Sequence, residues 1–215
     1  MNRLFILNLS VYIVGLIFLL VVSCKQNTGH VEVGGHVWMT ENLKTLTYQN
    51  GDSIKVIELD TIWQKEDEGA IARYENNDSL ANIYGFLYNW RAINDSRGLC
   101  PAGWHVATAA EWQDLIMACG GSDKAASLLK SNNFWLNQHE PILLTNKFKA
   151  IPGGNRKENG TFNGIGISGT FWSSTETKSD SAIAFYMNSA HSKVGFKEGH
   201  KLNALSCRCV LDYDQ

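Results

Sequence analysis

An apolar run at the amino terminus decides in which compartment this chain folds. The run extends from Leu4 to Val22 and follows a single positive charge, Arg3. A short basic region followed by an apolar core is typical of a secretory signal. We therefore predict that residues 1–23 are a signal peptide and that the rest of the chain folds outside the cytoplasm, where disulfides persist.

The apolar run ends at Ser23 and Cys24, a small residue followed by a cysteine. This ending resembles the bacterial lipobox, in which the cysteine is acylated and becomes the first residue of the mature protein. A transmembrane anchor is the alternative, because the run nearly reaches spanning length. The polar tail after Cys24 favours lipidation, since it lacks a basic stop-transfer cluster. We expect a lipid anchor at Cys24 in the outer membrane, a tether over 24–33 and a single domain over 34–212.

The composition excludes several classes of protein. Hydrophobic residues make up 44% of the chain and charged residues 19%, which suits a sizeable core and argues against disorder. The formal net charge is −2, so there is no basic field to attract a phosphate backbone. Nucleic acid is therefore not expected as a partner.

Four cysteines remain after Cys24, and an even number in an exported chain suggests two disulfides. They are Cys100, Cys119, Cys207 and Cys209. Cys207 and Cys209 lie two residues apart in an expected strand, so their thiols share a face and cannot easily bond to each other. Each would then pair with Cys100 or Cys119, in either arrangement. A zinc site is disfavoured, because no C-x-x-C and no clustered histidine accompanies these cysteines.

The clearest helix begins after Thr108. Thr108 to Glu111 forms a capping box, and apolar residues follow at helical spacing until Gly120-Gly121 ends the pattern. A second helix is predicted from Ser122, which we interpret as its N-cap. Both helices lie near the middle of the chain.

Short strands are expected on both sides of these helices. Val31 to Met39 predicts a hairpin that turns at Gly34-Gly35. The charged segment 58–80 is interpreted as an exposed excursion with at most one short strand. Later strands are predicted over 147–151, 170–174, 182–188, 193–197 and 203–211. The sum is an α+β domain.

Six segments in this order match the motifs of one known family. They read W-M-T-E-N-L from Trp38, Y-G-F-L-Y-N-W from Tyr84, C-P-A-G-W-H from Cys100 with Glu111-Trp112, P-G-G-N-R from Pro152, W-S-S-T-E from Trp172 and C-R-C-V from Cys207. Ala107 stands where proline is usual. The pattern resembles the Fibrobacter succinogenes major paralogous domain family and covers nearly the whole mature chain.

The resemblance implies a C-type-lectin-like fold, with two helices packed on short, twisted antiparallel strands and long loops. It is more distantly similar to formylglycine-generating-enzyme-type domains. Such folds pair a cysteine before or in the first helix with one in the final strand, which favours Cys100–Cys209. Cys119–Cys207 is the second pair we expect, although no family motif supports it. The resemblance brings no established activity.

Ligand contact is predicted in the glycine-rich loops that follow the helices, because binding residues usually lie on such loops. Asn155, Arg156 and Asn163 suit sugar hydroxyls, and Trp135 has polar neighbours and is expected to be an exposed stacking surface. The alternative is that the glycines only form tight turns and that Arg156 packs over a tryptophan. A further group of tryptophans is expected in the core: Trp104, Trp112 and Trp172.

No metal or cofactor is expected. Gly164 to Gly169 satisfies G-x-G-x-x-G but leads into a predicted strand, so it lacks the helix that a dinucleotide site needs. His105 is expected to be structural. The other histidines considered are scattered without ligand spacing: His36, His139, His191 and His200. Calcium bound in the lectin style is possible but unsupported, because Ile142 follows Glu140-Pro141 where an asparagine is needed.

These observations predict a lipid-anchored module that recognises carbohydrate or a partner protein and catalyses no reaction. One alternative is an enzyme on a formylglycine-generating-type fold, which would need a reactive cysteine pair. Another is a structural subunit of a surface assembly.

Overall fold

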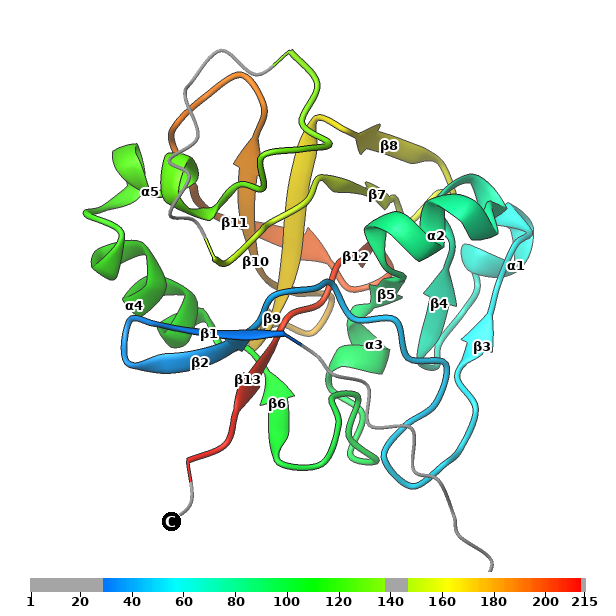
Figure 1. Cartoon of the computed structure of the whole chain (residues 1–215). Coiled ribbons are helices and arrows are strands. Elements are labelled where there is room, and N and C mark those ends of the chain that lie inside the picture. Colours follow the sequence, from blue (N-terminus) through cyan, green and yellow to red (C-terminus); the bar gives the residue numbers. More distant parts are fainter. Residues whose placement is uncertain (1–28, 138–146, 214–215) are drawn as a thin grey trace, which may run out of the picture.

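The computed structural model describes residues 29–137 and 147–213. The predicted signal peptide 1–23, the predicted lipidation site Cys24 and the Glu140-Pro141 pair lie outside the described residues. Within the described ranges the chain is mixed α+β, as predicted, with two sheets between flanking helices (Figure 1). Over these same ranges, no helix is both long enough and apolar enough to cross a membrane.

A four-stranded antiparallel sheet brings both ends of the described chain together. Its order is β1 (His30–Val33), β2 (His36–Met39), β13 (Cys209–Leu211) and β6 (Trp104–Val106). The β1–β2 hairpin turns at Gly34-Gly35, as predicted, because both glycines adopt a left-handed backbone. β1 lies inside the segment predicted as a tether, so the folded domain begins at His30 rather than at residue 34.

The second sheet is built around the β9–β10 hairpin. Its order is β11 (Gly195–His200), β10 (Ser181–Asn188), β9 (Ser168–Lys178), β7 (Gly153–Arg156), β12 (Ala204–Leu205), β5 (Leu87–Asn89), β4 (Ala70–Ala72) and β3 (Lys55–Val56), with β8 (Phe162–Ile165) beside β7. The pairs β7–β9 and β3–β4 are parallel.

Two strand predictions are wrong in detail. The strand expected over 147–151 is reduced to one bridge, Lys130 with Ala150, because Lys149 adopts a left-handed backbone (φ 53°) that interrupts an extended run. The strand expected over 203–211 is divided, because the chain leaves the larger sheet after β12 and joins the smaller sheet as β13.

The two long helices are α4 (Ala109–Ala118) and α5 (Ser122–Leu129). The capping box is confirmed: the Glu111 backbone N–H donates to Thr108 Oγ1 (3.2 Å), and Glu111 Oε2 accepts from the Thr108 N–H (2.7 Å). α5 begins at Ser122, but its N-cap is Gly121 and Ser122 is its first helical residue.

The interpretation of residues 58–80 as an exposed excursion is wrong. The segment contains α1 (Asp60–Trp63), β4, a 3₁₀ turn (Tyr74–Asn76) and the start of α2 (Asp78–Tyr84). Trp63 and the whole of β4 are buried, so this charged stretch contributes its own part of the core. The burial was not predicted because these few buried residues lie among many exposed charged residues in the sequence.

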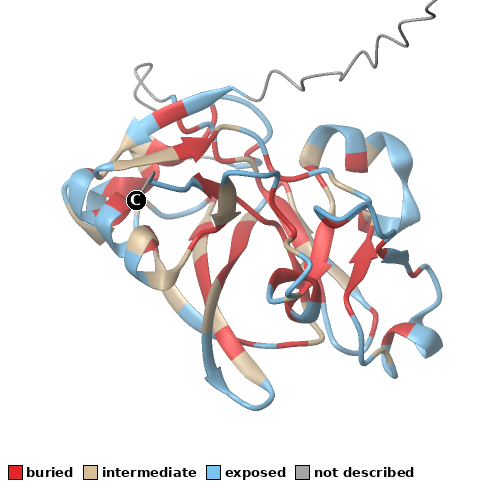
Figure 2. Cartoon of the chain, turned by 90° about the horizontal axis from the view of Figure 1, so that it is seen from below, coloured by how far each residue is buried: buried red, intermediate tan, exposed pale blue. Residues whose placement is uncertain are grey.

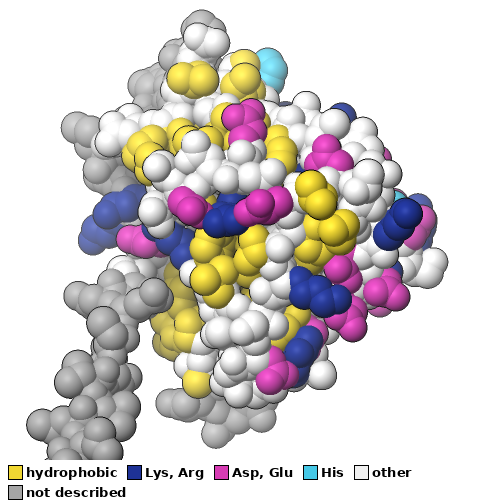
Figure 3. Space-filling view, turned by 90° about the vertical axis from the view of Figure 1, so that its right-hand side faces the viewer, with side chains coloured by type: hydrophobic (Ala, Val, Ile, Leu, Met, Phe, Trp, Pro, Cys, Tyr) yellow, Lys and Arg dark blue, Asp and Glu magenta, His cyan; other side chains and the backbone are white. Residues whose placement is uncertain are grey.

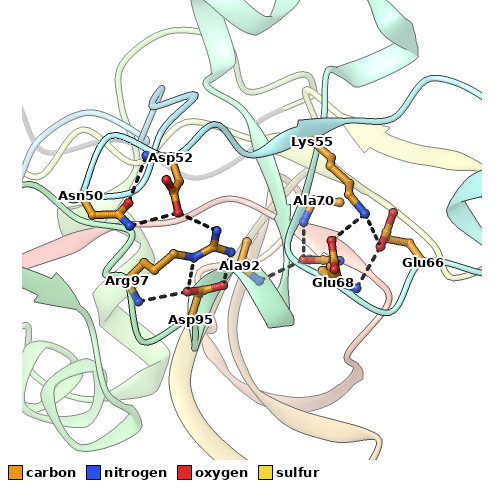
Figure 4. A network of polar contacts seen from close by, with 10 residues as sticks. Asn50, Asp52, Lys55, Glu66, Glu68, Ala70, Ala92, Asp95 and Arg97 are labelled. Carbon is orange, nitrogen blue, oxygen red and sulfur yellow. Dashed lines mark hydrogen bonds and ion pairs between the residues drawn. The ribbon is translucent and has the colours of Figure 1, made fainter.

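Side-chain contacts hold this region to the helix α3 (Trp90–Ile93). The buried Asn89 side chain accepts from the backbone N–H groups of Ala70 (2.9 Å) and Ala92 (3.0 Å). Figure 4 shows two groups of ion pairs nearby, in which Arg97 contacts Asp95 and Asp52, and Lys55 contacts Glu66 and Glu68. The cation of each pair, Arg97 or Lys55, is exposed to solvent, so each pair contributes little and Asn89 is the stronger restraint.

The core lies along the strands and the inner face of α4, while the outer turns and helices are largely exposed (Figure 2). The Trp112 ring stacks on Phe185 with centroids 4.4 Å apart and contacts Trp38 at 4.7 Å. Trp112 and Trp172 are wholly buried, as predicted, whereas Trp104 is half-buried.

One disulfide, Cys100–Cys209, joins the segment before β6 to β13, as favoured from the sequence. The second predicted pair is wrong: Cys119 and Cys207 are free and buried. Cys119 caps the end of α4 and belongs to a different part of the core from Cys207. Cys207 instead lies beside the disulfide, and the three sulfur atoms are within 4.8 Å of one another.

Candidate ligand-binding groove

A groove of about 370 Å³ opens where three segments of the chain meet. The segments are those that follow β2, follow α5 and precede β7, and α2 adds Ile83. Aromatic, amide and charged side chains line the groove. The lining residues are Thr40, Glu41, Asn42, Lys44, Ile83, Ser131, Asn132, Asn133, Phe134, Lys149 and Ile151.

The segment after α5 is fixed by Trp135. Its ring is buried in the core, only 8% exposed, and its Nε1 donates to the Ala150 carbonyl (2.9 Å). The Leu136 N–H donates to the Gly166 carbonyl (2.7 Å). The prediction that Trp135 is an exposed stacking surface is therefore wrong, because this indole is the anchor of the loop.

Its neighbour Phe134 takes the exposed position. The Phe134 side chain is 45% exposed and makes an edge contact with Tyr84, with ring centroids 5.7 Å apart. Its backbone has φ 78°, an unusual value for a bulky residue. A backbone conformation of this kind lowers the stability of the fold by about 1–3 kcal/mol and persists only where the surrounding structure imposes it. Lys149, across the same groove, is also left-handed. Backbone strain of this kind clusters at ligand sites.

The floor and the rim of the groove differ in burial. Asn42 is 2% exposed and forms the floor, since its Nδ2 donates to the Tyr84 carbonyl (2.8 Å) and its Oδ1 accepts from Arg208 Nε (2.9 Å). The rim carries exposed Asn132 and Asn133, whose amides can both donate and accept hydrogen bonds.

A charged pair completes the rim. Lys44 Nζ donates to the Asn82 carbonyl (2.7 Å) and lies 3.7 Å from Glu41 Oε2. The Glu41 side chain is 69% exposed, so its carboxylate is available to a ligand. The groove therefore offers one aromatic face, hydrogen-bond donors and acceptors, and charged groups of both signs.

The ligand residues predicted from the sequence do not line this groove. Asn155 is half-buried in β7 and pairs with the exposed Asn163 of β8. Arg156 is completely buried and stacks 4.6 Å from the centroid of Trp63, as in the alternative interpretation.

Arg156 is a structural residue, so its assignment as a ligand contact is wrong. Its guanidinium donates to the carbonyls of Gly160 (3.0 Å), Ile57 (2.5 Å) and Glu58 (2.9 Å) and pairs with Asp60 Oδ1 (2.6 Å). The five N–H donors of an arginine lie in one fixed plane. The hydrogen bonds from Arg156 therefore hold β7 to the segment between β3 and α1.

The surface also agrees with the low net charge. On the face that carries α1 and α2, basic and acidic side chains alternate around exposed apolar ones (Figure 3). A broad field of one sign is absent from this view. Among described residues, the apolar contribution near α1 includes Leu59 and Ile62.

The fold and the groove together define a disulfide-linked α+β domain with a groove that carries an exposed aromatic ring and two left-handed residues. The model of the Fibrobacter succinogenes major domain family matches residues 31–211, and the chain belongs to this family. Comparisons with curated proteins and with solved structures found no match.

Proposed function

We propose that this protein is a lipid-anchored, extracytoplasmic module that binds carbohydrate in the groove around Phe134 and catalyses no reaction. The observation that carries the proposal is the exposed Phe134 ring, whose backbone is strained and which lines the same groove as the amides of Asn132 and Asn133. A sugar ring has an apolar face that can stack on an aromatic side chain, and its hydroxyls can bond to amides and carboxylates.

The proposal includes a C-type-lectin-like fold. Its support is the disulfide that links the chain ahead of α4 to the final strand, and the adjacent α4 and α5 packed beside the sheets. The lipid anchor at Cys24 and the outer-membrane location rest on the sequence of residues 1–24.

The thiols support a binding role over an enzyme with a reactive cysteine. Burial raises the pKa of the Cys119 thiol to about 11 and holds the pKa of Cys207 well above its usual range. A nucleophilic cysteine needs the opposite, a lowered pKa and access to the substrate.

The test is a glycan-array screen of residues 25–215, with calcium and then with chelator. We expect a hit that survives chelation and that weakens about tenfold in Phe134→Ala, since an aromatic contact contributes about 1 kcal/mol or slightly more. Met117→Ala is the matched control, because Met117 is 64% exposed on α4 and does not line the groove.

Two results would contradict the proposal. A glycan hit with unchanged affinity in Phe134→Ala would place binding elsewhere on the domain. A blank array together with a partner protein cross-linked through Asn133→Cys in cells would make the groove a protein-binding site.

A further inference from the structure

The groove around Phe134 carries more apolar surface than its aromatic ring supplies. Ile83 is 45% exposed, the same fraction as Phe134, and Ile151 is half-buried in the lining. Ile83 comes from α2, and Ile151 comes from the segment ahead of β7. We call these two side chains the aliphatic lining. A ligand of this groove has to match both the ring and the aliphatic lining.

Two hydrogen bonds hold the residues on either side of Ile83. Asn42 Nδ2 donates to the Tyr84 carbonyl (2.8 Å). Lys44 Nζ donates to the Asn82 carbonyl (2.7 Å). The end of α2 is therefore fixed to the segment after β2, and Ile83 is positioned before a ligand arrives. Such preorganisation lowers the entropy cost of binding.

The backbone around Ile151 is fixed in a similar way. The Ala150 N–H donates to the Leu129 carbonyl (2.8 Å), and the Ala150 carbonyl accepts from the Ser131 N–H (2.8 Å). On the other side, the Gly153 N–H donates to the Ile151 carbonyl (3.1 Å). These bonds hold Ile151 next to the loop after α5, which carries the aromatic ring and the amides of the groove.

A plain hexose matches this lining poorly. Its ring face can stack on Phe134, but its other substituents end in hydroxyl groups. A hydroxyl group placed against Ile83 or Ile151 would lose hydrogen bonds to water without replacing them. An acetamido group, which is an N-acetylated amino group, instead carries a methyl group for the aliphatic lining. Its amide donates and accepts hydrogen bonds, as do the exposed amides of Asn132 and Asn133.

We propose that the groove selects saccharides that carry an acetamido group, with the methyl against Ile83 and Ile151 and the sugar ring on Phe134. This inference rests on the function proposed above and names its ligand class. The groove of about 370 Å³ is near the lower end of small-ligand sites, which span about 300–1,000 Å³. Its size suits one sugar with its substituent rather than a long chain.

The charges of the groove define the competing ligand. Glu41 and Lys44 lie 3.7 Å apart and offset each other, so this pair gives no net attraction to an ionised sugar. Lys149 adds one positive charge to the lining. An acidic oligosaccharide is therefore the alternative that the test has to include.

The test compares two trisaccharides that differ only in the substituent at C2 of each ring. They are tri-N-acetylchitotriose, with acetamido groups, and cellotriose, with hydroxyl groups. Both are titrated by calorimetry into the full-length protein, in a detergent without a sugar headgroup. We expect the acetylated trimer to bind at least about tenfold more tightly, because one methylene group in a hydrophobic pocket changes recognition by about 10- to 200-fold.

Three variants assign this preference to the aliphatic lining. Ile83→Asn should weaken the acetylated trimer about tenfold and change cellotriose by less than about twofold. Phe134→Ala should weaken both trimers to a similar extent, since both stack on the ring. The control is Ile62→Asn, because Ile62 is 51% exposed on α1 and does not line the groove, and it should change neither affinity. If Ile83→Asn unfolds, the comparison of the two trimers on the wild type decides.

Several results would overturn the acetamido preference and leave carbohydrate binding intact. They are equal affinity for the two trimers, tighter binding of cellotriose, and tighter binding of an acidic trimer, trigalacturonate. Deacetylated chitotriose, which carries ammonium groups, is the last comparison, and its tighter binding would assign the preference to Glu41. An unchanged preference in a folded Ile83→Asn variant would place the acetamido group elsewhere.

If no trimer binds, the glycan array decides. Hits that share an acetamido group would support the inference, and hits that lack one would overturn it. A blank array would overturn both this inference and the proposed function.

Discussion

At the scale of single residues, Arg156 shows how a binding residue and a core residue can look alike in a sequence. Its guanidinium bonds to three backbone carbonyls and to Asp60, and it stacks on Trp63 and Phe162. Arg156→Ala should therefore lower the free energy of unfolding by about 3 kcal/mol, because buried acceptors lose a charged donor. Urea unfolding measures this loss.

The neighbouring Lys157 provides the control for Arg156. It is exposed, and Lys157→Ala should change stability by less than about 0.5 kcal/mol. An Arg156→Ala variant as stable as Lys157→Ala would show that the guanidinium contacts are not maintained in solution.

His105 gives the protein a pH dependence at the same scale. Its pKa rises from 6.5 to about 9, mainly through Glu111 and then Asp212. The stabilising effect is complete below about pH 6.5 and is lost as the pH rises through 9. The side chain is 38% exposed, so solvent screening limits the effect to the order of 1 kcal/mol. Urea unfolding of the wild type at pH 6 and pH 9.5 should show this decrease.

The control is His105→Gln, in which the free energy of unfolding should no longer differ between pH 6 and pH 9.5. Glu111 adds a loss at acidic pH, because its pKa is lowered by His105 and Thr108 although burial opposes that shift. A wild type and a His105→Gln variant with the same slope from pH 6 to 9.5 would contradict the role given to His105.

At the scale of elements, the start of α4 is the best-defined boundary. Thr108→Ala should cost about 1 kcal/mol, because Thr108 Oγ1 accepts the Glu111 N–H and orients its carboxylate. Ser122→Ala, at the start of α5, should cost less than about 0.5 kcal/mol, since the N-cap of that helix is Gly121 and makes no side-chain bond. Thermal or urea unfolding of both variants checks the contrast, and equal costs would contradict it.

Local patterns predicted those elements whose geometry is local. The capping box of α4 and the glycine turn between β1 and β2 depend on neighbouring residues alone, and both were correct. The sequence allowed one short strand in segment 58–80, but the burial of β4 was missed because it is only three residues long and follows several charged residues. Its burial depends on Asn89 and Trp63, which no local pattern reports.

The groove was only partly accessible to sequence reasoning for the same reason. Phe134 and Trp135 are adjacent, and one of them had to face the core. The sequence does not indicate which, because the choice depends on the Ala150 carbonyl that accepts from Trp135 Nε1. The approach of His36 to Glu111 and Asp114 likewise depends on the packing of Gly34 against α4.

At the scale of the whole molecule, the cysteines divide into one bridge and two sheltered thiols. Residues 25–215 should react slowly with a thiol reagent when folded, release two thiols per chain in denaturant and four after reduction. Mass mapping should assign the two labels to Cys119 and Cys207. If no thiol reacted in denaturant before reduction, Cys119 and Cys207 would form the second disulfide that the sequence suggested.

The disulfide also closes a long loop, with 109 residues separating its cysteines. By chain entropy, removing it in a Cys100→Ala, Cys209→Ala double variant should cost about 5 kcal/mol. Urea unfolding measures this, and a cost below about 1 kcal/mol would show that packing alone orders the two sheets.

The hydrogen bonds between Gly29 and Thr40 place the rim of the groove next to the amino-terminal end of the folded domain. The Gly29 carbonyl accepts from both the N–H and the hydroxyl of Thr40, and Thr40 lines the groove. Gly29 follows Cys24 by five positions in the sequence, so their Cα atoms can be at most about 18 Å apart. With acyl chains on Cys24, the rim around Thr40 would lie within about 18 Å of the lipid headgroups. Its ligands would then be saccharides displayed close to the bilayer, and long glycans reaching in from the medium would have to approach from the side.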